Sequence, residues 1–254
     1  MPEFPALIFD VDGTLADTER DGHRVAFNQA FAAAGLDWHW SVELYGELLA
    51  VTGGKERMLY YLERNRPDWP RPDNLKDFIA GLHKAKTRFY TELLATGQIP
   101  LRPGVKDLIL SAREAGIPMA IATTTTPDNV TALLQHSLHP ESVSWFVAIG
   151  AGDIVPAKKP APDIYEYVLA QMGWDPQSCL AFEDSYNGLV SAQAAHLRTV
   201  VTINDYTHHQ DFSGATLVLD HLGDTDLPCT VLGGAVTLPN LTRFTLETIP
   251  LLLG

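Results

Sequence analysis

Two carboxylates lie one residue apart near the start of the chain, in the segment DVDGT at 10–14. The segment follows the apolar run 6–9, which is typical of a buried strand, and it leads into a glycine turn. Because side chains alternate along a strand, Asp10 and Asp12 lie on the same side. One carboxylate can attack a phosphate ester, and the other can protonate the departing oxygen and later deprotonate water. The segment therefore predicts phosphoryl transfer through an aspartyl phosphate on Asp10, although a pair of turn or capping aspartates would show the same pattern.

Two further polar segments could assist this chemistry. Thr123 ends the apolar run 118–122, and its hydroxyl and the backbone N–H groups after it could bind the oxygens of a transferring phosphoryl group. Lys159 is held in place by the proline that follows it and can neutralise both nucleophile and phosphate, whereas Lys158 is expected to face water. A solvated loop and an ordinary strand end remain the alternatives for these segments.

A second acidic pair, Glu183 and Asp184, follows the apolar run 179–182. Carboxylate oxygens together with a bound phosphate are ligands that Mg²⁺ prefers. The ion would screen the repulsion between Asp10 and an anionic substrate. The alternative is that the acidic pair caps the helix that follows it.

The composition excludes several classes of protein. The 254 residues carry a net charge of −13, whereas binding to nucleic acid needs a basic surface. The two cysteines, Cys179 and Cys229, form no zinc-binding pattern. No apolar stretch approaches the roughly 20 residues of a membrane span, and the N-terminal residues do not show the pattern of a signal peptide. We therefore expect a cytoplasmic monomer that binds a small anionic molecule.

The apolar runs alternate with amphipathic helical segments, which predicts an α/β fold with a doubly wound parallel sheet. In such a sheet, ligands bind at the carboxyl ends of the strands, where the acidic residues and Thr123 fall. The expected strands are 6–9, 118–122, 145–149, 179–182, 199–203 and 216–219, and the expected helices between them are 105–115, 128–135, 163–172 and 188–195.

Residues 18–94 show helical periodicity without a buried strand, which predicts a small helical cap domain inserted after the first strand. The core domain then comprises residues 1–17 and 95–254, and the chain returns to it through 97–104. Residues after about 224 have no functional interpretation; 230–237 is a candidate strand and 241–253 a candidate helix or edge element. Trp38, Trp40 and Trp69 are expected to pack inside the cap.

Taken together and in this order, the four segments resemble those of the haloacid dehalogenase superfamily of phosphatases. The strings AKKPAPDIY at 157–165 and FEDSYNGL at 182–189 are similar to the branch that holds β-phosphoglucomutase and the CbbY proteins. The strings ELL at 47–49, TGGKER at 52–57, HKAKT at 83–87 and ATTT at 122–125 resemble CbbY proteins specifically. That group is associated with carbon fixation and dephosphorylates xylulose-1,5-bisphosphate, an inhibitor of Rubisco; in a plant-type source the resemblance would imply the chloroplast stroma.

The resemblance implies a role for each matching position. Asp10 would be the nucleophile, Asp12 the acid and base, and Thr123 and Lys159 the groups that hold the transferring phosphate. Asp10, the backbone carbonyl of Asp12, Glu183 and Asp184 would bind Mg²⁺. The residues contacting the sugar bisphosphate would be Glu19, Tyr45, Gly53, Gly54, Lys55, Glu56, Arg57, His83, Lys86 and Thr124.

Two alternatives remain open at this point. A phosphosugar mutase of the β-phosphoglucomutase type uses the same aspartyl phosphate but returns the phosphoryl group to a sugar. A receiver-like or non-catalytic phospho-ligand protein would need neither Asp12 as an acid nor a helical insertion.

Overall fold

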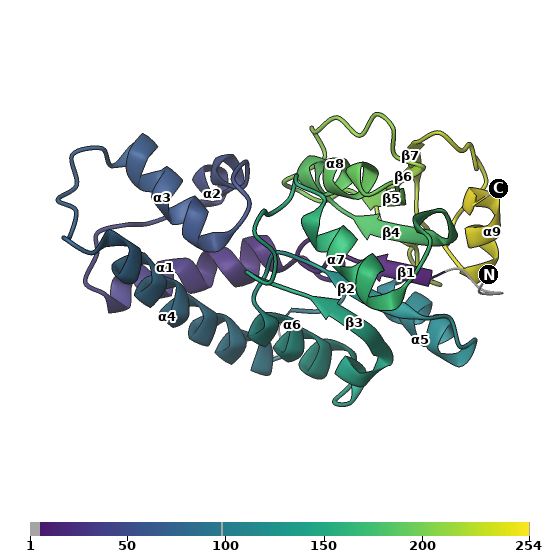
Figure 1. Cartoon of the computed structure of the whole chain (residues 1–254), viewed down its shortest axis with the longest axis horizontal. Helices are drawn as coiled ribbons and strands as arrows, with labels where there is room; N and C mark the ends of the chain where they lie inside the picture. Colours follow the sequence, from purple (N-terminus) through teal and green to yellow (C-terminus); the bar gives the residue numbers. More distant parts are fainter. Residues whose placement is uncertain (1–5, 98, 254) are drawn as a thin grey trace.

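The structure, a computed structural model, describes residues 6–97 and 99–253. Within them the chain forms a seven-stranded sheet in the order β3-β2-β1-β4-β5-β6-β7, in which β7 alone runs antiparallel to its neighbour (Figure 1). The predicted α/β sheet is thereby confirmed. The strands are β1 (Ala6–Phe9), β2 (Met119–Ala122), β3 (Phe146–Gly150), β4 (Cys179–Glu183), β5 (Arg198–Thr202), β6 (Leu217–Leu219) and β7 (Val231–Gly233).

Helices cover both faces of the sheet because its central strands are apolar on both sides. In β1, Leu7 and Phe9 belong to one buried cluster, and Ala6 and Ile8 belong to another. This division follows the two-residue period of a strand. The first cluster includes α5 (Val105–Glu114), α6 (Pro127–Leu133) and α9 (Ile249–Leu253), whereas the second includes α7 (Asp163–Met172) and α8 (Tyr186–Ala194).

Residues 19–95 form a group of helices beside the sheet, which we call the helical lobe (Figure 1). The sheet and the helices that cover it, in the remaining described residues, are the sheet lobe. It has its own buried cluster, in which Trp38 and Trp40 are almost fully enclosed and the Trp69 ring packs 4.9 Å from that of Trp38. The expected packing of the tryptophans is therefore confirmed. The elements are the π-helical turn η1 (Glu19–His23), α1 (Arg24–Ala33), α2 (Val42–Leu48), α3 (Gly54–Asn65) and α4 (Leu75–Ala95).

Two segments connect the lobes, and they lie side by side. Ala16, on the way out, forms an antiparallel bridge with Leu101, on the way back. In addition, the long helix α4 reaches from the helical lobe to the sheet lobe, where it packs on α6, as Figure 1 shows. Gln98 of the predicted return segment, and residues 1–5 and 254 of the predicted core domain, lie outside the described residues.

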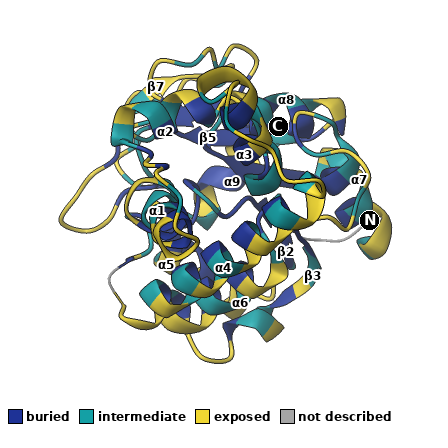
Figure 2. Ribbon diagram, turned by 90° about the vertical axis from the view of Figure 1, so that its left-hand side faces the viewer, coloured by how far each residue is buried: buried dark blue, intermediate teal, exposed yellow. Residues whose placement is uncertain are grey.

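The C-terminal segment belongs to the sheet lobe. Phe244, Ile249 and Leu252 are buried in the cluster that contains Leu7 and Phe9. The predicted strand at 230–237 is shortened to β7. Figure 2 shows the buried sheet in the interior and exposed residues mainly on the loops and outer helix faces. The remaining short helices are η2 (Leu134–Leu138), η3 (Ser142–Trp145), η4 (Pro176–Ser178) and η5 (Leu246–Thr248). Among the described residues, no helix combines the length and the apolarity that crossing a membrane requires.

Candidate active site

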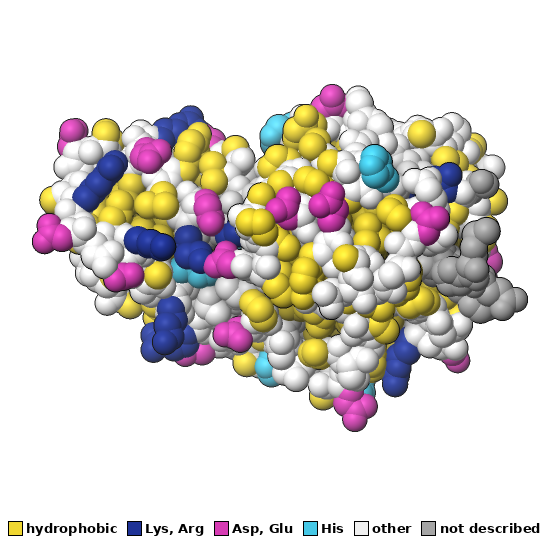
Figure 3. Space-filling view, in the orientation of Figure 1, with side chains coloured by type: hydrophobic (Ala, Val, Ile, Leu, Met, Phe, Trp, Pro, Cys, Tyr) yellow, Lys and Arg dark blue, Asp and Glu magenta, His cyan; other side chains and the backbone are white. Residues whose placement is uncertain are grey.

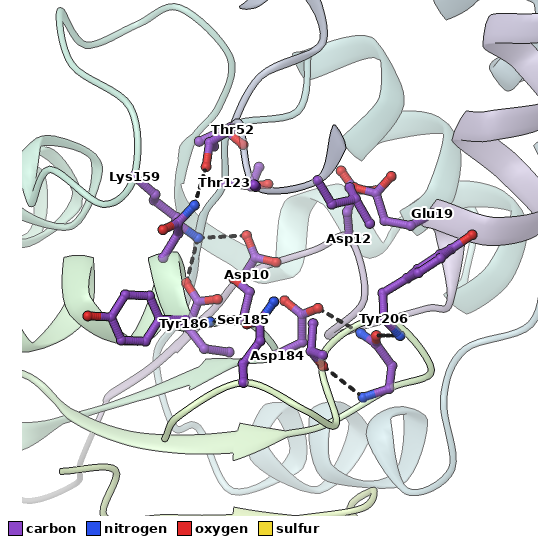
Figure 4. A pocket seen from close by; sticks show the side chains of 18 of the residues that line it. Asp10, Asp12, Glu19, Thr52, Thr123, Lys159, Asp184, Ser185, Tyr186 and Tyr206 are labelled. Atoms are coloured by element: carbon purple, nitrogen blue, oxygen red, sulfur yellow. Dashed lines mark hydrogen bonds and ion pairs between the residues drawn. The ribbon is translucent and has the colours of Figure 1, made fainter. Parts of the chain in front are cut away.

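Asp10 lies directly after β1, between β2 and β4, at the carboxyl end of the sheet. Its backbone N–H donates to the carbonyl of Phe182 at 3.0 Å, which extends the β1–β4 ladder and fixes the residue. One carboxylate oxygen lies 2.7 Å from the ammonium of Lys159 (Figure 4). The other accepts from the hydroxyl of Thr14 at 3.3 Å. Asp10 is therefore held in one orientation in a buried position.

Asp10, Glu183 and Asp184 form a buried acidic cluster, in which one ligand atom from each lies within 4.8 Å of the others. Burial raises the pKa of Asp10 to about 7, with Glu183 adding to the rise and Lys159 opposing it. Burial also raises the pKa of Asp184 well above its usual range, and repulsion from Asp10 and Glu183 adds to this. The single ammonium of Lys159 does not balance the charge of three buried carboxylates, so the cluster fits a metal ion, which would supply the missing positive charge.

Glu183 supports this fit through its second oxygen. One oxygen accepts from Lys159 at 2.6 Å and from the hydroxyl of Tyr165. The other, Oε2, is buried and has no hydrogen-bond partner among the described residues. A buried carboxylate oxygen without a partner is costly unless a cation or water satisfies it.

Asp12 faces the helical lobe rather than the acidic cluster. Its Oδ1 accepts from the hydroxyl of Thr18 at 2.6 Å and lies 2.7 Å from Nε2 of His23. Nδ1 of His23 lies 2.8 Å from the ammonium of Lys86, which can only donate, so the ring proton is assigned to Nε2. Burial alone would raise the pKa of Asp12, but His23 and Thr18 hold it well below its usual range.

These groups border a cavity of about 470 Å³ between the two lobes. Asp10, Thr123, Lys159 and Asp184 line it from the sheet lobe, as do Thr124 and Glu183. Glu19 and Arg57 line the opposite wall, from the helical lobe. The structure thus brings all the predicted residues of the sheet lobe to one cavity.

The helical-lobe wall is built around a buried arginine. Arg57 donates to the hydroxyl of Tyr45 at 2.9 Å, and that hydroxyl donates in turn to the carboxylate of Glu19. The guanidinium itself lies 3.9 Å from Glu19. Nε of Arg57 is buried without a hydrogen-bond partner in the described part of the chain. Tyr45 therefore holds Glu19 and Arg57 in place, and the Nε–H of Arg57 is available to bind an anionic group.

A second, smaller cavity of about 80 Å³ adjoins Arg57, Lys86 and Thr124. Its lining from the helical lobe also includes Gly53, Gly54, Lys55 and His83. The Gly54 backbone lies so close to His83 that an added Cβ would be 2.6 Å from the ring. Burial, assisted by nearby lysines, lowers the pKa of His83 to about 3, so the ring is neutral. The ammonium of Lys86 is occupied by His23 and lies over the rings of Phe27 and Tyr90.

Ion pairs between the lobes border this second cavity, and Figure 3 shows dark-blue Lys or Arg and magenta Asp or Glu side chains next to one another where the two lobes meet. Lys158 lies 3.0 Å from Glu56 of α3 and 2.9 Å from Asp153 of the sheet lobe, and Asp153 also pairs with Lys55. The side chain of Lys158 is only 15% exposed. The expectation that Lys158 faces water is therefore wrong, because two carboxylates from different lobes draw its ammonium inward.

Sequence reasoning missed His23, Thr18 and Asn204. Asn204 follows β5 and donates to Oδ2 of Asp184 at 2.7 Å. His23 stands four residues after Glu19, so a helical reading of 19–23 would have placed both side chains on the face toward the cavity. No comparable local signal marks Asn204, whose partner is 20 residues earlier in the chain.

Comparison with known proteins gives consistent matches. The family model of the haloacid dehalogenase-like hydrolases matches residues 4–196. The protein CbbY encoded on a plasmid of Cupriavidus necator is 52% identical over 223 residues, which cover 88% of this chain and 87% of that protein. A CBBY-like protein of Arabidopsis thaliana is 44% identical, with 86% of this chain and 69% of that protein covered.

Solved structures agree with the sequence matches. CbbY from Rhodobacter sphaeroides in complex with phosphate is 47% identical and matches with a TM-score of 0.80, covering 88% of this chain and 98% of that one. A mutant of the same protein, solved in complex with xylulose-(1,5)bisphosphate, is 46% identical with the same TM-score. The match to a hydrolase family argues against the alternative hypothesis of a receiver-like protein. The chain thus belongs to the haloacid dehalogenase-like hydrolases, among the CbbY proteins, and is a phosphatase of that superfamily.

Proposed function

We propose that the protein is a Mg²⁺-dependent phosphatase that removes a phosphate from xylulose-1,5-bisphosphate through an aspartyl phosphate on Asp10. One observation carries the proposal: the acidic cluster and Lys159 face a cavity whose opposite wall presents the buried cation Arg57. One end of that cavity suits a reacting phosphate, and the other suits a second anionic group. Residues 18–94 would act as a cap domain over a monomeric cytoplasmic enzyme.

The first half-reaction would take place at Asp10. A carboxylate oxygen attacks phosphorus, a P–O bond to Asp10 forms, and the ester P–O bond breaks. Thr123 and Lys159 hold the phosphoryl oxygens, and the Lys159 ammonium balances the charge that builds up on them. Burial alone would lower the pKa of Lys159, but Asp10 and Glu183 raise it above its usual range, so the amine stays charged.

Asp12 would transfer the protons in both half-reactions. Because Asp12 is ionised in the free protein, it would first take up a proton from solvent as the substrate enters, and it would give that proton to the departing alkoxide. It would then remove a proton from the water that attacks the phosphorus of the aspartyl phosphate. His23 donates to Asp12 and is itself held by Lys86, whose pKa burial lowers to about 8. We propose that Lys86 acts on the reaction through His23, since its ammonium is already bound there.

Asp10, Glu183, Asp184 and the backbone carbonyl of Asp12 would hold the Mg²⁺ ion. When bound, the ion supplies positive charge that lets the anionic substrate approach the carboxylates and stabilises charge in the transition state. The role of the chain is to present the carboxylates. Tyr165, Lys159 and Asn204 orient those of Glu183 and Asp184 by hydrogen bonds.

Metal binding should stabilise the protein more at pH 8 than at pH 5. In the metal-free protein, Asp10 binds its proton up to about pH 7, whereas in the unfolded chain it loses the proton near pH 4. Stability without metal therefore falls as the pH rises between these values, while Mg²⁺ requires the ionised form. The stabilisation by Mg²⁺ should grow by about 1.4 kcal/mol per pH unit below pH 7. Thermal unfolding with Mg²⁺ or with EDTA at pH 5, 6, 7 and 8 measures this, and an equal shift at every pH would contradict the proposed ligands.

The proposal of a bisphosphate substrate rests on Arg57 in the helical-lobe wall of the cavity. Arg57 is fixed by Tyr45 and Glu19 and retains a buried N–H without a partner in the described residues, which is the donor that a second phosphate would use. The relative from Rhodobacter sphaeroides that was solved with xylulose-(1,5)bisphosphate is similar to this chain over most of its length. Together these observations support a sugar bisphosphate rather than a monophosphate.

A phosphate-release screen tests the substrate. The enzyme is mixed with Mg²⁺ and C5 and C6 sugar mono- and bisphosphates, with xylulose-1,5-bisphosphate and ribulose-1,5-bisphosphate compared side by side. We expect kcat/KM for the ribulose isomer to be at least about 100-fold lower, because the two substrates differ in the configuration of the C3 hydroxyl, and buried polar groups that match one orientation are left unpaired by the other. Equal rates on the two isomers would be consistent with a phosphatase but would contradict the assignment of xylulose-1,5-bisphosphate as its specific substrate.

The same screen separates a phosphatase from a mutase. A phosphatase releases one inorganic phosphate for each substrate consumed, whereas a mutase converts the sugar phosphate to an isomer without net release. Isomer without phosphate would overturn the proposed hydrolysis.

A further inference from the structure

Arg102 is a buried cation that the proposed mechanism does not use. It follows Leu101 on the segment that returns from the helical lobe, and its side chain is only 6% exposed. Nε lies 3.3 Å from a carboxylate oxygen of Asp17. The two terminal nitrogens of the guanidinium donate to the backbone carbonyls of Gly13, Thr202, Ile203 and Asp220.

These carbonyls come from segments that are distant in the sequence and adjacent in the fold. Gly13 belongs to the turn after β1 that carries Asp10 and Asp12, Thr202 is the last residue of β5, and Ile203 follows it. The Thr202 contact is 2.9 Å, and that to Asp220, which follows β6, is 2.8 Å. One side chain thus ties the nucleophile turn to the ends of two neighbouring strands.

Two of the tied segments contact Asp184 directly. A Cβ on Gly13 would lie 2.2 Å from Oδ2 of Asp184, so the Gly13 backbone packs against this carboxylate. Asn204, the residue after Ile203, donates to the same oxygen at 2.7 Å. The carboxylate of Asp184 therefore lies between the Gly13 backbone and the Asn204 side chain. Arg102 binds the backbone at Gly13 and next to Asn204.

We propose that Arg102 is a positioning residue that sets the metal-binding geometry of Asp184 through Gly13 and Asn204. The inference rests on the proposed metal site. An arginine suits this role because its planar guanidinium offers several donors in fixed directions, whereas a lysine ammonium at the end of a flexible chain cannot reach the same set of carbonyls.

The test is Mg²⁺ binding by calorimetry to the full-length Arg102→Lys protein, without substrate and well below its unfolding temperature. We expect the dissociation constant to rise about 10- to 100-fold, the usual effect of removing a group that orients a metal ligand. Arg243→Lys is the matched control, because Arg243 also joins distant parts of the sheet lobe, through Asp107, but lies away from the site. A folded Arg102→Lys protein that binds Mg²⁺ as the wild type does would overturn the inference.

Asn204→Ala provides a second route, since it removes one link to Asp184 and leaves the donors of Arg102 in place. It should also weaken Mg²⁺ binding, and the double variant should lose less than the product of the two single effects, because both act on the same carboxylate. If Arg102→Lys does not fold, unchanged binding by Asn204→Ala overturns the inference. Wild-type protein that fails to bind Mg²⁺ would instead refute the proposed metal site and this inference with it.

Discussion

Replacing Asp10 with asparagine should reduce phosphate release by about 10⁴-fold or more. The side chain keeps its shape, but a neutral amide oxygen is too weak a nucleophile to form the acyl phosphate. The fold should survive the change. Asp10 lies beside Glu183 and Asp184, and removing its charge relieves repulsion in a buried cluster, while the amide oxygen can still accept from Lys159.

The measurement combines steady-state phosphate release with trapping of the phosphoryl-enzyme. Wild-type protein quenched during turnover should carry phosphate on Asp10, and Asp10→Asn should carry none, with an unfolding temperature no lower than that of the wild type in EDTA. Asp226→Asn is a matched control, because Asp226 is exposed on the C-terminal segment. A substantial rate in the Asp10→Asn protein would show that another group is the nucleophile.

The sheet could be predicted because each strand is an apolar run bounded by polar residues. β1 shows why: it has parallel neighbours on both sides and helices on both faces, so all four of its residues are buried. Boundaries were less accurate, since β5 begins at Arg198, one residue before the apolar run. The helix α1 was not anticipated as an element of its own.

The catalytic groups of the sheet lobe could be predicted for a topological reason. Parallel strands end at one edge, so Asp10, Thr123 and Glu183 had to approach one another once the strands were recognised. The helical-lobe contacts depended on the resemblance to CbbY proteins. The structure places Arg57 and Glu19 on the cavity wall opposite Asp10, and the individual roles of these residues stay predictions.

Groups that act through long-range contacts escaped prediction. The carbonyls that Arg102 binds are 89 to 118 positions away in the sequence, and no local pattern relates them. Lys158 shows the same limitation, because its partner Glu56 lies 102 residues earlier, on the helical lobe. A lysine pair on a loop gives no sign of which ammonium is drawn into an interface between lobes.

Replacing Asp12 with asparagine should separate the two half-reactions. The amide oxygen can still accept from Thr18 and His23, so the local structure is retained, but the group can no longer transfer a proton. For a sugar phosphate, whose alkoxide leaves only with a proton, kcat/KM should fall by about 10²- to 10⁴-fold. For p-nitrophenyl phosphate, whose leaving group needs no proton, the first half-reaction should be much less affected.

The second half-reaction should remain slow with either substrate, because water must lose a proton as it attacks the aspartyl phosphate. Rapid mixing of Asp12→Asn with p-nitrophenyl phosphate should therefore give a burst of about one nitrophenolate per active site, followed by a slow steady rate. The burst distinguishes a proton-transfer role from a purely structural one, since damage to the cavity would slow both steps for both substrates. An equal loss on the two substrates, without a burst, would show that Asp12 serves only to hold the turn against His23 and Thr18.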